Sequence, residues 1–231
     1  MLEFLFMLTK NDTTIEDCLE IYDEVRDSGL RWVGFKDVGV PFSTLEQLTR
    51  RIQADDRKAV LEIVSVSAAS ELASARAATE LGVDLLMGGT RPNEVTRLLA
   101  DTSIRYFPFA GRITGHPSVL EGTLEEITEN AREITALARV DGLDLLAYRW
   151  AGDVPRLMEA VVAAASGPVV IAGSIATAEQ IRAAANAGAW GFTIGGAALD
   201  RALVPGGSTR DQVDHALAAA MTSEARARFP G

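Results

Sequence analysis

The sequence predicts a single (β/α)8 barrel, also called a TIM barrel, that extends over residues 1–231. Short blocks rich in valine, leucine and isoleucine alternate with amphipathic stretches along the whole chain, as in repeated strand–helix units. Turns made of small residues follow the last two blocks, where such barrels bind phosphate. A doubly wound open sheet is the competing interpretation, but it rarely has so many evenly spaced units and usually carries its phosphate turn early. The barrel is therefore the predicted fold.

The first half of the chain predicts strands that each end in a polar or glycine-containing turn. Apolar residues at helical spacing follow the first strand, with Thr13 or Thr14 as the helix cap and Gly29 as the helix end. The expected strands are residues 3–8, 32–38, 59–65 and 82–90, and helices are expected after Thr14, from Ser43, over 68–81 and from Pro92.

The second half repeats this pattern with one long interruption. Residues 110–123 form the longest predicted loop, and a loop of this length in a barrel favours a functional cover over a simple connection. The motif Gly-Val-Asp-Leu-Leu at 82–86 recurs as Gly-Leu-Asp-Leu-Leu at 142–146. Because Asp84 and Asp144 precede the apolar cores of their strands, we expect both at the end opposite the active site. The remaining expected strands are 104–109, 142–152, 168–172 and 190–194, and the remaining helices include 124–139, 154–165 and 210–227.

Composition limits the partners and the compartment. The chain has 22 basic and 32 acidic residues, and the resulting net charge of −10 disfavours nucleic acid and anionic membranes as partners. No apolar run approaches membrane-spanning length, and no targeting segment is expected. Cys18 is the single cysteine, so no internal disulfide forms and a reducing cytoplasm is the expected setting. The oligomeric state is left open, with Trp150 and Phe229 as candidates for contacts in a homo-oligomer.

Residues 168–199 contain two strand–turn units that together predict an anion site. Glycine in the two turns lets backbone amides approach a ligand, and the positive end of a following helix favours an anion. Either turn alone is ordinary turn chemistry, but the pair is typical of one phosphate-binding cradle. The predicted phosphate-binding residues are Gly173, Ser174, Ile175, Gly195 and Gly196.

These paired turns resemble those of the ribulose-phosphate-binding barrels. That superfamily includes the phosphoribosyl isomerases of histidine and tryptophan biosynthesis, indoleglycerol-phosphate synthase, ribulose-phosphate epimerase and N-acylmannosamine-6-phosphate epimerase. The resemblance covers about the last quarter of the chain at the level of motifs, and the strand–helix rhythm extends it to the rest. It implies a small phosphorylated substrate. The strand ends at 7–9 and 107–109 lack the acids that the phosphoribosyl isomerases use there, and two histidines fit the metal site of ribulose-phosphate epimerase poorly.

Lys36 and Glu62 are the predicted catalytic pair. Side chains alternate along a strand, so Glu62 shares a face with Val60 and Val64. The outer face of a barrel strand meets apolar helices, and Glu62 should therefore point inward, as should Lys36 by the same alternation. We expect Glu62 to remove a proton next to a carbonyl and Lys36 to stabilise the enolate or return the proton. This pair is similar to the lysine and glutamate of N-acylmannosamine-6-phosphate epimerases.

The sequence leaves other interpretations of this pair open. It is also compatible with a buried ion pair of purely structural value. A lyase, such as an aldolase or a decarboxylase, would instead use Lys36 as a Schiff-base amine. The third alternative is a barrel that binds a phosphorylated metabolite without converting it. Nothing resembles a nicotinamide or flavin fingerprint, so we expect no cofactor, and the favoured function is a metal-independent isomerase or epimerase of a small phosphorylated sugar or polyol.

Polar residues at other strand ends complete the candidate set. His116, in the long loop, is a candidate proton shuttle or substrate contact, and Asp37 is a candidate for orienting Lys36. Arg149 is the preferred cation for a carboxylate or a second phosphate, because its planar fork suits oxyanions. Tyr148 and Thr90 are candidate substrate contacts. The ordinary alternatives are a solvated loop position for His116, a turn role for Asp37, a rim salt bridge for Arg149 and simple packing for Tyr148.

Overall fold

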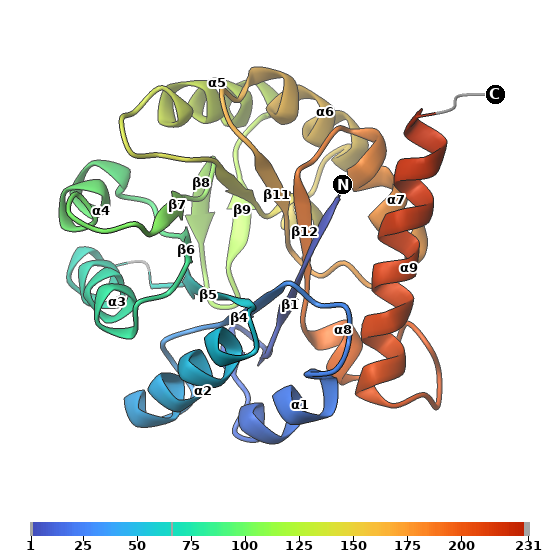
Figure 1. The fold of residues 1–231 in the computed structure, drawn as a ribbon. Helices are drawn as coiled ribbons and strands as arrows, with labels where there is room; N and C mark the ends of the chain where they lie inside the picture. The colour runs from blue at the N-terminus through green and yellow to red at the C-terminus, as the bar shows by residue number, and fades with distance from the viewer. Residues whose placement is uncertain (1, 66, 229–231) are drawn as a thin grey trace.

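Eight parallel strands form the barrel in the computed structural model, which describes residues 2–65 and 67–228, with side chains as far as residue 221 (Figure 1). A bridge between Phe109 and Asp144 closes the ring, supported by a 2.9 Å hydrogen bond from the Asp144 amide to the Pro108 carbonyl. The predicted single-domain barrel is therefore confirmed. Around the ring the strands follow the order β10 (Leu143–Leu145), β11 (Val169–Ile171), β12 (Gly191–Ile194), β1 (Glu3–Met7), β4 (Trp32–Phe35), β5 (Lys58–Ile63), β6 (Leu85–Gly88) and β7 (Arg105–Phe107).

Helices surround the strands on the outside, and the last helix lies along the first and the seventh (Figure 1). Capping boxes built on Thr123 and Thr177 start two of them, because each threonine oxygen accepts from a first-turn amide while the residue three positions later reaches back. The helices are α1 (Cys18–Val25), α2 (Phe42–Ala54), α3 (Ala68–Leu81), α4 (Pro92–Leu98), α5 (Leu124–Thr135), α6 (Val154–Ala164), α7 (Ala178–Asn186), α8 (Gly196–Leu199) and α9 (Thr209–Arg228), with a 3₁₀ turn η1 (Ala147–Arg149) after β10.

Two hairpins cover the carboxyl ends of the strands, where the sequence predicts only loops and a helix start. The first, β2 (Thr9–Lys10) and β3 (Thr13–Thr14), has Asn11 and Asp12 as its turn, with φ angles of 51° and 59°. A two-residue hairpin turn of this type needs positive φ at both positions. The expected cap at Thr13 or Thr14 is therefore wrong, and α1 begins only at Cys18. The second hairpin, β8 (Arg112–Thr114) and β9 (Val119–Glu121), lies within the long loop.

Alternating side chains divide the apolar core into an outer layer and a barrel interior. Leu61 and Ile63 pack outward under the helices, while Val60 faces inward, as the alternation along the strand predicts. Aromatic rings fill the amino-terminal end of the interior, where Trp190 meets the edges of Trp32 and Phe107 at centroid distances of 5.5 and 5.6 Å. Because that end is packed, only the carboxyl end is left for a ligand.

Two further expectations concern the surface. Within the residues that the structure describes, no helix has both the length and the apolar character needed to cross a bilayer. Trp150 is half-buried, and its indole N–H donates to the Gly122 carbonyl over 2.9 Å, so it holds the second hairpin. Phe229, the other aromatic residue suggested for contacts between copies, lies outside the described residues.

Candidate functional site

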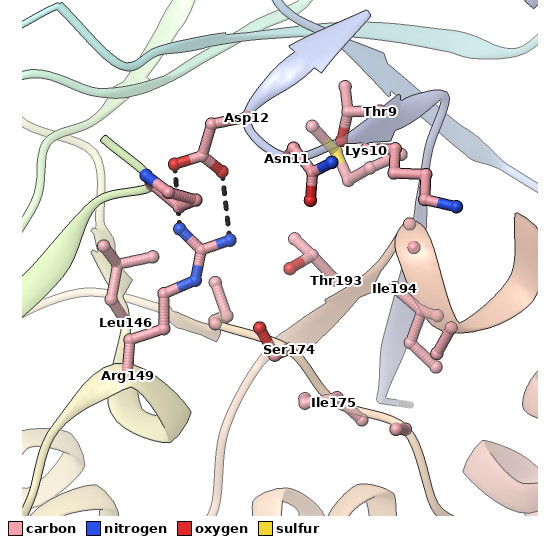
Figure 2. A pocket seen from close by; sticks show the side chains of 18 of the residues that line it. Thr9, Lys10, Asn11, Asp12, Leu146, Arg149, Ser174, Ile175, Thr193 and Ile194 are labelled. Carbon is pink, nitrogen blue, oxygen red and sulfur yellow. Dashed lines mark hydrogen bonds and ion pairs between the residues drawn. The ribbon is translucent and has the colours of Figure 1, made fainter. Parts of the chain in front are cut away.

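A cavity of about 390 Å³ opens at the carboxyl ends of the barrel strands (Figure 2). The two small-residue turns line one side of it, and charged side chains from the barrel interior line another. Most of the residues singled out in the sequence are brought together here. Those lining the cavity are Lys36, Glu62, Arg149, Gly173, Ser174, Ile175, Gly195 and Gly196.

The turn after β11 offers backbone amides to the cavity. Gly173 and Ser174 have positive φ angles of 94° and 76°, and a Cβ on Gly173 would lie 3.0 Å from Arg149 Cγ. The next amide, of Ala176, donates to Gln180 Oε1 over 2.7 Å. Within the described chain, no acceptor takes the amide hydrogens of Gly173, Ser174 or Ile175. These donors are therefore available to a ligand.

The turn after β12 needs glycine for a different reason. A Cβ on Gly195 would lie 2.7 Å from the Thr9 carbonyl oxygen and 2.9 Å from that of Met7, so the first hairpin packs directly on this residue. A Cβ on Gly196 would meet nothing within 4 Å, and Gly196 begins α8 beside the cavity. The two turns thus lie in one cavity, as the sequence predicts for a cradle.

Lys36 and Glu62 form a buried ion pair beside a third charged residue. Lys36 Nζ lies 3.4 Å from Glu62 Oε2 and 2.8 Å from Asp12 Oδ1. All three side chains are less than a tenth exposed. The Lys36 backbone is also fixed, because the Thr14 hydroxyl donates to its carbonyl and accepts from its amide at 2.7 and 2.8 Å. The ammonium is therefore held at a defined point of the cavity wall.

Asp12 is the central acid of the site, and the sequence reasoning missed it. Its carboxylate accepts two hydrogen bonds from Arg149, of 2.8 and 3.0 Å, and one of 2.7 Å from the Ser118 amide (Figure 2). Burial raises the pKa of Asp12, but the bonds from Arg149 and the charge of Lys36 more than reverse this and hold it well below its ordinary value. The sequence feature that could have revealed this position is the Asn11-Asp12 pair between threonine residues, because such a pair is typical of a hairpin turn.

The expectation that Asp144 lies at the end of the barrel opposite the active site is wrong. Its strand neighbour in register is Val170, an interior residue, and its side chain is fully buried inside the barrel. Burial and the nearby charge of Glu62 raise the pKa of Asp144 well above its ordinary value. Asp84, in contrast, lies at the opposite end as predicted, where it accepts from Lys58 Nζ over 2.7 Å.

Among the described residues, no group of three or more histidine, cysteine or acidic side chains is arranged to hold a metal ion.

Arg149 lines the cavity, but its guanidinium is already engaged. Both terminal nitrogens bind Asp12, and Nη1 also donates to the Ser118 carbonyl over 3.0 Å. The expectation that Arg149 receives a carboxylate or a second phosphate is therefore not supported by this geometry. The residue instead ties the two hairpins to η1 above the barrel.

Asp37 and Thr90 lie away from the cavity. Neighbours along an extended chain point to opposite sides, so Asp37 turns from Lys36 toward α3 and accepts from the Ser74 hydroxyl. Asp12 and Glu62, not Asp37, orient the lysine. Thr90 donates its amide and hydroxyl to the buried Glu71, at 2.8 and 3.2 Å, and so anchors the loop after β6.

His116 and Tyr148 are also outside the cavity lining. His116 is exposed in the second hairpin, although Pro117, to which it is joined by a cis peptide bond, contributes to the lining. Tyr148 is half-buried in η1 and donates to the Gln180 carbonyl over 3.4 Å, and burial raises its pKa. Neither side chain is placed for contact with a ligand.

Comparisons with known proteins agree on the fold. No protein-family model matches the sequence, and no curated protein matches it. Orotidine 5'-phosphate decarboxylase from Pyrococcus horikoshii is similar with a TM-score of 0.66 and 15% identity, covering 94% of this chain and 99% of its own. Thiamine phosphate pyrophosphorylase from Pyrococcus furiosus gives 0.65 and 13%, covering 96% of both chains. Phosphoribosylanthranilate isomerase from Thermotoga maritima gives 0.62 and 14%, covering 96% of this chain and all of its own.

These identities are low, so the likeness shows the fold alone. The barrel fold that the sequence resemblance implies is therefore confirmed. The neighbours include an isomerase, a decarboxylase and a pyrophosphorylase, and the shared fold does not choose among their reactions. The activity of this chain has to be argued from its own cavity.

We expect Asp12→Asn to destabilise the protein by about 3–5 kcal/mol at neutral pH, because the partly buried Arg149 loses its carboxylate partner and the buried Lys36 loses one of two. The folded-state pKa of Asp12 is depressed, so its contribution is complete above the unfolded value of about 4 and is lost as the pH falls below it. The measurement is urea unfolding of wild type and variant from pH 3 to 7. The difference between their unfolding free energies should become smaller as the pH falls.

Asp214→Asn is the matched control, since Asp214 pairs with Arg210 on the exposed face of α9. Its loss should change the unfolding free energy by less than about 1 kcal/mol. A pH-independent effect of Asp12→Asn, or one as small as the control, would contradict the central position of Asp12.

Proposed function

We propose that this barrel is an enzyme that binds a small molecule carrying one phosphate and moves a proton next to its carbonyl, in an isomerisation or an epimerisation. The observation that carries the proposal is the presence of Lys36, Glu62 and both small-residue turns in one cavity. A phosphate anchor and an acid–base pair are the two parts that such a reaction needs.

The phosphate end is assigned to the backbone. Amide hydrogens of 173–175 have no partner among the described residues, and Gly196 opens α8 at the neighbouring turn. The exposed Lys10, which pairs with Asp200 at the cavity rim, adds a cation within reach. In a protein with a net charge of −10, such local donors have to supply the attraction for an anion.

The reacting end is assigned to Glu62 and Lys36. Glu62 takes the proton from carbon, the bonding electrons move to the carbonyl oxygen, and Lys36 donates a hydrogen bond to the enolate oxygen. Return of a proton from Lys36 to the other face of the same carbon gives an epimer. Return of the proton to the former carbonyl carbon, while the proton of the neighbouring hydroxyl passes to the enolate oxygen, gives an isomer. Since Arg149 is bound by Asp12, this end supports an uncharged carbonyl and hydroxyl groups better than a second anion.

Polar side chains between the two ends support a substrate with hydroxyl groups. Figure 2 shows Asn11, Thr193 and Ser174 around the space beside the pair of Asp12 and Arg149. All three line the cavity, and Asn11 and Ser174 are exposed to it or to solvent. We therefore favour a phosphorylated sugar or polyol as substrate, and a reducing cytoplasm as the setting for a chain whose one cysteine is a buried free thiol.

Proton transfer is tested by exchange of substrate hydrogen for deuterium in heavy water, followed by NMR over a panel of small aldose and ketose phosphates. We expect wild type to exchange the hydrogen next to the carbonyl, and Lys36→Met and Glu62→Gln each to lose about 100-fold or more. Lys58→Met, at the other end of β5, is the control and should exchange at the wild-type rate. Unchanged exchange in both site variants would refute the assignment.

Anion binding is tested by thermal shift with inorganic phosphate and with the same panel. Ser174→Asp places a carboxylate among the free amides and should abolish the stabilisation that phosphate gives to wild type. Ser174→Asn, of similar size and uncharged, should retain most of it. If both variants respond like wild type, the turn does not hold the anion. Stabilisation without any exchange would favour a barrel that binds its ligand but does not convert it.

A lyase that forms a Schiff base on Lys36 is the second candidate, favoured by the burial of this amine in the cavity wall. It requires a neutral amine, whereas Lys36 Nζ is paired with the carboxyl groups of both Asp12 and Glu62. Borohydride reduction in the presence of the panel should therefore leave the protein mass unchanged. A covalent adduct on Lys36 that is missing from Lys36→Met would favour the lyase instead.

A further inference from the structure

Asp144 is a buried acid that the proposed reaction does not use. Its exposed fraction is zero, and neither carboxyl oxygen has a hydrogen-bond partner among the described residues. It lies two positions before Leu146, which lines the cavity, so both point to the same face of the chain and Asp144 lies one level deeper. The charge of Glu62 acts on it from the neighbouring level. Asp144 is thus beneath the catalytic pair and not in contact with the substrate space.

The charges around Asp144 come from several elements. Glu62 belongs to β5, Lys36 follows β4, Arg149 lies in η1 and Asp12 is in the first hairpin turn. Its register partner on β11 is Val170, which belongs with Met87 and Phe107 to the apolar cluster of the barrel interior. Arg105, also on β7, lies over the Phe107 ring at the packed end of the barrel.

The balance of these charges disfavours an ionised Asp144. The two cations, Lys36 and Arg149, are paired with two carboxyl groups, those of Asp12 and Glu62. A third ionised carboxylate would leave a net negative charge buried in the barrel, which is expensive in a medium of low polarity. Two neighbouring carboxylates also disfavour ionising together.

We propose that Asp144 holds a proton in the resting protein and so adds no negative charge beside Glu62 and Lys36. It acts as a positioning residue, because a neutral Asp144 leaves both cations to Asp12 and Glu62 and keeps Lys36 beside the base. Its ionisation would repel the Glu62 charge and compete for Lys36. The second part of this inference rests on the proposed function of Glu62, while the protonation of Asp144 does not.

The first test compares urea unfolding of wild type and Asp144→Asn from pH 4 to 8. A carboxyl that keeps its proton on folding binds more protons in the folded than in the unfolded state, so wild-type stability falls as the pH rises. Asn mimics the protonated acid, so the variant should not lose stability in this way as the pH rises. The ratio of the two unfolding constants should therefore change in favour of the variant, by up to tenfold per pH unit, starting near pH 4.

Asp84→Asn is the matched control from the other copy of the same sequence motif. Asp84 is partly exposed and accepts from Lys58 and from the Ala59 amide, so its replacement should give no gain that grows with pH. A flat ratio for Asp144→Asn, or a variant that becomes the less stable one as the pH rises, would overturn the proposal.

The second test does not depend on unfolding. Infrared spectra of folded wild type in heavy water at neutral pH should contain the carbonyl band of a protonated carboxyl, and Asp144→Asn should lack it. Asp84→Asn should retain the band. If the band is absent, or appears only after a chelator removes a bound cation, Asp144 is ionised and the proposal fails. Neither readout uses a substrate, so loss of exchange in Glu62→Gln remains a separate test of the proposed function.

Discussion

The contact between Asp12 and the two buried cations is the interaction on which the arrangement of the site depends. One carboxylate binds Arg149 through both of its oxygens, Lys36 through one of them, and the Ser118 amide through the other. It therefore joins the first hairpin, the second hairpin, η1 and the end of β4 at one point above the barrel. Removing its charge would leave Arg149 without a carboxylate partner and Lys36 with Glu62 alone.

This pairing also divides the cavity into two ends of different chemistry. With Arg149 and Lys36 matched by acids, the barrel interior has no excess positive charge to attract a phosphate. Free amides at 173–175 are then the strongest sites for an anion on the opposite wall. In the proposed reaction, this difference would orient a substrate with one charged end so that its uncharged carbonyl is directed toward Glu62. Orientation of this kind can supply a large part of the rate of a proton transfer.

Local patterns predicted the barrel, the two turns and the inward-facing Lys36 and Glu62. Strand alternation and small-residue turns depend only on neighbouring residues in the chain, which is why they can be predicted from the sequence. The sequence did not predict the role of Asp12, because its partners Ser118 and Arg149 lie 106 and 137 positions away. The hairpin that carries Asp12 was also interpreted as the start of a helix. Asp144 was misplaced because its motif repeats that of Asp84. β6 begins after Asp84, whereas β10 contains Asp144 in its middle, and the two acids therefore lie at different levels.

The central claim is that Asp12, together with Glu62, pairs with both cations and leaves the anion to the backbone turns. A crystal structure of the protein soaked with inorganic phosphate tests it most directly. The account predicts an anion within hydrogen-bond distance of the amides at 173–175 and 195–197, with Asp12 still bound to Arg149 and Lys36. An anion bound instead to Arg149 or Lys36, with Asp12 displaced, would contradict it.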